Sequence, residues 1–98
     1  MQTIPREQAR KYAFDWRDAP LLRVAPGERF AVETFDAGTG YFKTPADKAI
    51  PGKRPGFDRF PPLVNPIAGP VYLDGAERGD VLVIEIDEIE VAEQSWTA

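Results

Sequence analysis

Residues 64–89, with the sequence VNPIAGPVYLDGAERGDVLVIEIDEI, are the main basis for predicting the fold class of this chain. Proline fixes the backbone angle φ and glycine adopts conformations that other residues avoid, so the run NPIAGP at 65–70 predicts a rigid, turn-rich loop. A short apolar run at 71–73 follows, and D-G and G-D turn signals come after it. From residue 81 the side chains alternate between apolar and polar with the period of a half-buried strand. The stretch therefore predicts β-structure.

Two further strands are predicted upstream, at residues 21–24 and 29–35, and the proline-glycine turn between them predicts a β-hairpin. We expect residues 29–35 and 81–91 to be central strands. The side chains expected in their shared core are Phe30, Val32, Leu82, Ile84 and Ile86. Burial of each contributes about 1.5 to 3 kcal/mol, so replacing Ile84 by alanine is expected to cost roughly 2 to 5 kcal/mol. Residues 1–12 predict either a short helix around 6–11 or a loosely held terminal arm.

Residues 36–62 have no periodic apolar pattern and are rich in proline and glycine, which predicts a long loop. Loops longer than about 15 residues in compact proteins are usually functional or disordered. The phenylalanines Phe42, Phe57 and Phe60 indicate a loop that packs on another surface. We therefore expect residues 38–60 to border a functional site.

The net charge of the 98-residue chain is −4, which gives no electrostatic support to general nucleic-acid binding. Residues 74–98 carry eight acidic side chains and one basic one, whereas 43–59 carry five basic and two acidic ones. This asymmetry indicates either two solvated surfaces or a docking surface for a partner. No apolar run approaches the ~20 residues of a membrane span, and the amino terminus lacks the apolar core of a secretory signal. These features predict a cytoplasmic protein without membrane association.

Histidine and cysteine are absent from the sequence, which removes the commonest general base and any thiolate chemistry. The only serine is Ser95, so neither Ser-His-Asp nor Cys-His catalysis can be assembled within the chain. A carboxylate-only metal site stays open, since oxygen ligands suit hard cations. Any catalysis by this chain is therefore expected to need a second polypeptide.

The order of elements in residues 64–89, N-P-x-x-G-P, short strand, G-A-E-x-G-D and apolar strand, resembles the acetamidase/formamidase family of amide hydrolases. Trp16 and the blocks at 20–28 and 34–40 are also similar to the opening part of that family, so the resemblance covers residues 12–97. The chain departs from the family pattern at two places. Many relatives carry a histidine where this chain has 12–14, YAF, and a glutamine where it has Tyr41.

The resemblance implies a mainly β fold in which residues 1–98 are the amino-terminal, β-rich part of a sandwich or barrel with long ordered loops, completed by a second chain. It implies an amidase, inactive alone, that acts on a C–N bond other than a peptide bond in a small linear or cyclic amide. A larger acetamidase/formamidase-like chain would supply most catalytic groups and most ligands of a divalent metal such as zinc, within a higher hetero-oligomer. The alternative is a non-catalytic β-rich assembly or regulatory module. Three explanations of the end at Ala98 stay open. They are a split gene, cleavage of a longer precursor, including self-cleavage, and an arbitrary boundary of the sequence.

Asp36 is the first candidate for catalysis and for metal binding, because it ends an apolar strand, precedes a glycine-rich turn and matches the Asp-Ala block of the family. Its carboxylate is equally suited to capping that turn. Asn65 is a candidate for substrate binding, since its amide both donates and accepts hydrogen bonds, although Asn-Pro is also a common turn starter. Tyr41 and Phe42 are candidates for an apolar rim around the substrate, or for packing against a partner.

Overall fold

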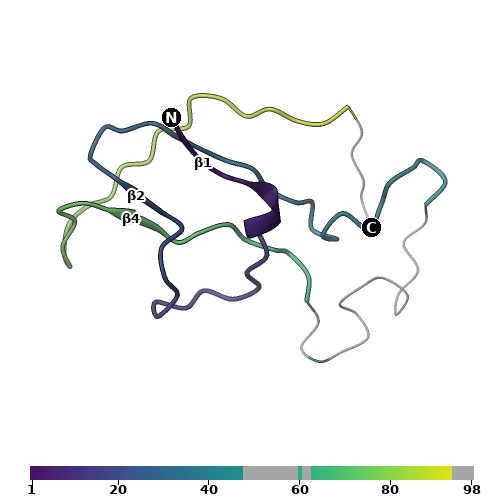
Figure 1. The fold of residues 1–98 in the computed structure, drawn as a ribbon, viewed down its shortest axis with the longest axis horizontal. Coiled ribbons are helices and arrows are strands. Elements are labelled where there is room, and N and C mark those ends of the chain that lie inside the picture. Colours follow the sequence, from purple (N-terminus) through teal and green to yellow (C-terminus); the bar gives the residue numbers. More distant parts are fainter. Residues whose placement is uncertain (48–59, 61–62, 94–98) are drawn as a thin grey trace.

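The computed structural model describes residues 1–47, 60 and 63–93. Its elements in chain order are β1 (Gln2–Ile4), the 3-10 helix η1 (Arg6–Gln8), β2 (Leu22–Val24), β3 (Phe30–Val32) and β4 (Val71–Leu73). Figure 1 shows these short strands gathered at one side of the molecule, with long connecting segments beyond them. The prediction of a mainly β chain is confirmed, while the sandwich or barrel stays a prediction. Within the described part of the chain, no helix has the length and apolar character needed to cross a membrane.

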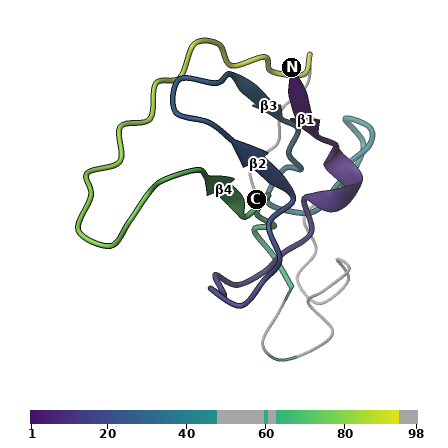
Figure 2. The same ribbon diagram turned by 60° about the vertical axis from the view of Figure 1, so that its left-hand side comes forward.

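The strands form two parallel pairs, which Figure 2 shows side by side. β1 pairs with β3, with Ile4 opposite Val32, and β2 pairs with β4, with Val24 opposite Leu73. The predicted strands at 21–24 and 71–73 are therefore confirmed, and that at 29–35 is shorter than expected. The predicted hairpin between β2 and β3 is wrong. The turn between them forms, but β2 and β3 pair with other strands, because a turn signal fixes the local bend and leaves the pairing to the rest of the chain.

The amino terminus carries part of the small core, so the expected loosely held arm is wrong. Ile4 is completely buried, and Ala9, Val24 and Phe42 are also buried. The expected helix over 6–11 is reduced to a single 3-10 turn. It follows an extended Pro5 (φ −71°, ψ 153°) and ends at Ala9, whose N–H donates to the carbonyl of Arg6 at 2.9 Å.

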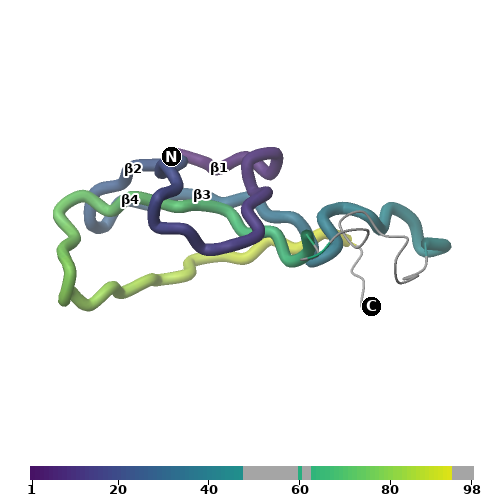
Figure 3. The backbone as a smooth tube through the Cα atoms, turned by 90° about the horizontal axis from the view of Figure 1, so that it is seen from below, coloured from purple at the N-terminus to yellow at the C-terminus, as the bar shows by residue number. Residues whose placement is uncertain are grey.

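Residues 81–93 differ most from expectation, because they form no strand in this structure. Ile84 and Ile86 are more than 70% exposed and Leu82 is 64% exposed, and on β3 Phe30 and Val32 are also exposed. The shared core predicted for these five side chains is therefore wrong for this chain by itself. Among the described residues no strand lies beside 81–93 to supply ladder hydrogen bonds. Figure 3 shows this segment as the yellow trace along the margin of the molecule.

Candidate functional site

A tight turn at residues 36–41 holds the first candidate residue. Asp36 accepts hydrogen bonds from two backbone amides, Gly38 N–H to Oδ2 at 3.1 Å and Gly40 N–H to Oδ1 at 2.7 Å. The Thr39 N–H also donates to the Asp36 carbonyl at 3.0 Å. Asp commonly bonds the amides that follow it in this way. The turn-capping interpretation therefore describes this conformation, and the catalytic role of Asp36 stays a prediction.

Two residues near this turn have a backbone conformation that side chains other than glycine rarely adopt. Thr39 has φ 55° and Asn65 has φ 57°, and they are the non-glycine residues with positive φ in the described part of the chain. A β-branched residue at positive φ is a true outlier, and such strain costs about 1 to 3 kcal/mol and often lies at functional sites. The Asn65 N–H donates to the carbonyl of Ala37 at 2.9 Å. The structure thus brings the exposed Asn65 to the Asp36 turn, and the role of the two residues at the base of a site stays a prediction.

A third segment, residues 11–12, joins these two. The Tyr12 hydroxyl lies 3.2 Å from Thr39 Oγ1, within hydrogen-bond distance. Lys11 and Ile67 exchange backbone hydrogen bonds of 3.2 and 2.7 Å, which hold 11–12 beside the loop that contains Asn65. Tyr12 and Tyr41, one from each place where the chain departs from the family pattern, therefore both lie at this turn.

Tyr41 and Phe42 pack against each other, with ring centroids 5.1 Å apart and planes at 85°. Phe42 is buried beneath the turn, since a Cβ at Gly38 would lie 3.6 Å from its ring. Tyr41 is half-buried. The structure therefore supports packing for Phe42, and contact of either ring with a substrate stays a prediction. Phe60 is exposed, and Phe57 lies outside the described residues.

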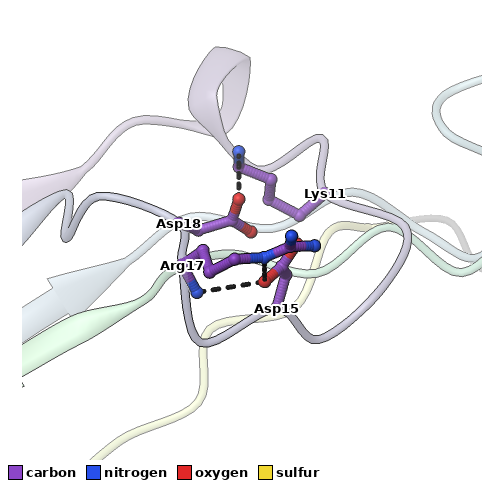
Figure 4. A network of polar contacts seen from close by, with 4 residues as sticks. All are labelled: Lys11, Asp15, Arg17 and Asp18. Atoms are coloured by element: carbon purple, nitrogen blue, oxygen red, sulfur yellow. Dashed lines mark hydrogen bonds and ion pairs between the residues drawn. The ribbon is translucent and has the colours of Figure 1, made fainter.

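The segment that follows Tyr12 is held by charged side chains, as Figure 4 shows. Arg17 donates from Nε to Asp15 Oδ1 and from Nη2 to Asp15 Oδ2, both at 3.0 Å, and Lys11 Nζ lies 3.5 Å from Asp18 Oδ1. The Arg17 hydrogen bonds lower the pKa of Asp15 below its ordinary value of 3.8. Trp16, which belongs to the family-like opening block, is almost fully exposed on this loop.

The described residues do not form a metal site. Over 1–47, 60 and 63–93, no three side chains of the histidine, cysteine, aspartate or glutamate type come together as ligands. Asp36 would offer at most one carboxylate, and both of its oxygens accept backbone hydrogen bonds. A metal ligated mainly by a partner chain stays a prediction.

Sequence reasoning missed several residues at this site. The sequence marks Tyr12 only as a departure from the family pattern, and it predicts no role for Thr39, which Tyr12 contacts, or for Arg6 and Arg10, which lie over the ring of Phe35. The flanking glycines give no signal for positive φ at Thr39 itself, because that conformational freedom belongs to glycine. The contacts of Tyr12 and the arginines bridge residues more than 20 positions apart, and a single sequence carries no signal for them.

A family model described as the Acetamidase/Formamidase family matches residues 3–97 of the chain. The chain belongs to this family. Its activity class at the coarse level is therefore hydrolysis of amides. Comparison with curated proteins and with solved structures gives no match.

Proposed function

We propose that this chain is the amino-terminal part of an amidohydrolase that cleaves the C–N bond of a small linear or cyclic amide, and that a larger chain of the same family supplies most catalytic groups. Family membership supports amide hydrolysis. The lack of histidine throughout the sequence supports a division of catalytic labour between two chains, because the commonest general base must then come from elsewhere.

The observation that carries this proposal is the segment 81–93, which pairs with no strand among the described residues. It presents seven large apolar side chains to solvent, each at least 64% exposed: Val81, Leu82, Val83, Ile84, Ile86, Ile89 and Val91. Monomeric proteins rarely expose so large a contiguous apolar surface. An extended segment with free backbone groups is also a template for pairing with a strand of another chain.

The size of the exposed surface agrees with an incomplete unit. The chain exposes 8393 Å², whereas a compact monomer of 10.9 kDa exposes about 5,600 Å². Its radius of gyration is 16.0 Å, against about 13 Å for a compact domain of this length. Residues 74–93 carry eight acidic side chains and one basic one, and this charge favours a partner with a basic surface over a second copy of this chain.

In this proposal the site lies at the Asp36 turn. Asp36 acts as a carboxylate that orients the attacking water or contributes one ligand to a metal held by the larger chain. The exposed Asn65 side chain, fixed beside the turn by its backbone bond to Ala37, is suited to hold the substrate amide, because it both donates and accepts hydrogen bonds. The half-buried Tyr41 supplies apolar surface next to it, and the buried Phe42 packs against the Tyr41 ring.

The replacement Asp36→Asn tests this assignment. It keeps the shape of the side chain and one acceptor oxygen, but it removes the charge and replaces the other oxygen, which accepts a turn amide in Asp36, by an NH2 donor. We expect amide hydrolysis by the assembled enzyme to fall by about 100-fold or more, as for loss of a group that acts in proton transfer or charge stabilisation, with assembly preserved. Asp80→Asn is the matched control, because Asp80 also caps a turn, accepting from the Glu77 N–H at 2.8 Å, and lies outside the site. Equal activity of the two variants would assign Asp36 to the turn alone.

A further inference from the structure

Two arginine side chains converge on one aromatic ring next to the Asp36 turn. Arg6 Cζ lies 5.3 Å and Arg10 Cζ 4.7 Å from the centroid of the Phe35 ring. The two guanidinium carbons are therefore at most about 10 Å apart, the limit set by these two distances. Both arginines are exposed. Within the described residues, neither forms an ion pair or a side-chain hydrogen bond.

A third arginine in the same chain, Arg23, stacks on an aromatic ring and also has a carboxylate partner. Arg23 Cζ lies 4.5 Å from the Tyr72 centroid, and its Nε donates to Asp74 Oδ1 at 2.5 Å. The ring takes the face of the guanidinium group and the carboxylate takes its N–H edge. This arrangement suits the planar guanidinium group, which stacks on aromatic faces and binds carboxylates through its N–H donors. Arg6 and Arg10 have the ring and lack the carboxylate.

Among the described residues, no acidic side chain forms an ion pair with either arginine. Asp36 directly follows Phe35, but its two oxygens accept from Gly38 and Gly40. Two like charges at this separation repel each other, and a bound anion offsets the repulsion. The ring itself is fixed at the turn, since a Cβ at Gly40 would lie 3.5 Å from Phe35 Cδ1 and Cε1. The arginines are thus held over the same turn as the candidate site.

We propose that Arg6 and Arg10, stacked on Phe35, bind a small carboxylate. This inference rests on the proposed function, because hydrolysis of an amide releases a carboxylate, and a site beside the Asp36 turn would receive it. The planar, delocalised guanidinium groups favour a carboxylate, which accepts two parallel N–H bonds, over a spherical anion such as chloride. The pair binds the acid end of the product and takes no part in bond cleavage.

Titration of the intact chain with sodium acetate tests this, with sodium chloride at equal ionic strength as the reference. In NMR spectra of the labelled protein, the Nε–H signals of Arg6 and Arg10 and the ring signals of Phe35 should shift in a saturable way with acetate. We expect Arg6→Gln or Arg10→Gln to weaken acetate binding at least threefold and the double variant to abolish it. Arg23→Gln is the matched control, since Arg23 is ring-stacked and already paired, and it should leave acetate binding unchanged.

A second variant distinguishes loss of acetate binding from loss of folding. Arg6→Lys keeps the positive charge and removes the planar fork, so it should keep the fold and bind acetate more weakly than the parent. Shifts that acetate and chloride cause equally, or saturable acetate shifts that persist in the double variant, would overturn the inference. The readout needs no turnover. Absent acetate binding in an active enzyme refutes this inference alone, and acetate binding in a complex without amidase activity refutes only the proposed function.

Discussion

Individual side chains of this protein are held largely by backbone amides and by neighbouring charged or polar groups. Asp36 accepts two turn amides, and Glu28 accepts from the Gln2 side chain at 3.0 Å and from the Ala25 N–H at 3.1 Å. Gln2 lies on β1, and Glu28 closes the turn between β2 and β3. A single carboxylate therefore links the amino-terminal strand to the turn that directs the chain into β3.

The pKa of Glu28 tests this link. The Gln2 hydrogen bond, followed by that of Ala25, lowers the pKa of Glu28 below its ordinary value of 4.5. Because the pKa in the folded chain is depressed, the stabilisation is fully present above pH 4.5 and is lost as the pH falls through the folded value. We expect Gln2→Ala to raise the Glu28 pKa toward 4.5 in a carboxyl NMR titration. The pKa of Asp15, which Arg17 lowers, is the control and should not move. A Glu28 pKa that is the same in both proteins would contradict the link.

At the scale of elements, the sequence predicted what depends on neighbouring residues. The strands at 22–24 and 71–73 and the turns at Asp36 and Asp80 follow from short local patterns, and the structure contains them. Pairing was not predictable, because the partners of β2 and β3 lie in remote parts of the chain. The same reason hid the approach of Tyr12 to Thr39, which connects residues 27 positions apart.

The segment 81–93 shows a different limit. Its alternation correctly indicates a segment suited to a half-buried strand. A strand also needs a neighbour to satisfy its backbone groups and cover its apolar face, and the described residues of this chain supply none. The alternation thus indicates that this segment needs a neighbouring strand and an apolar surface that covers one of its faces. The described residues of this chain contain the segment without either.

Two isoleucine replacements measure whether segment 81–93 packs on the rest of this chain. Ile4 is completely buried, whereas Ile84 is 74% exposed. In denaturant unfolding of the isolated chain, Ile4→Ala should lower the free energy of unfolding by about 2 to 5 kcal/mol. Ile84→Ala, the same chemical change, should lower it by less than about 0.5 kcal/mol. A large loss for Ile84→Ala in the isolated chain would mean that 81–93 packs on this chain after all.

At the scale of the whole molecule, the central claim is that the chain is one part of an amide hydrolase. Its family supports the chemistry, and its missing histidine and exposed apolar segment support a division between two chains. The candidate site at the Asp36 turn contains a carboxylate, an amide side chain and two aromatic rings. Under the proposed division of labour, the partner would supply the general base and most metal ligands.

Isolation of the chain from the organism that encodes it, at its natural level and under native conditions, tests this claim most directly. Intact mass measurement should find a larger, histidine-containing chain of the same family in fixed stoichiometry, and the complex should release ammonia or an amine from a small amide. Amide hydrogen exchange at residues 81–93 should be slow in that complex and fast in the separated chain. A chain isolated alone, cooperatively folded and with slow exchange at 81–93, would contradict the account.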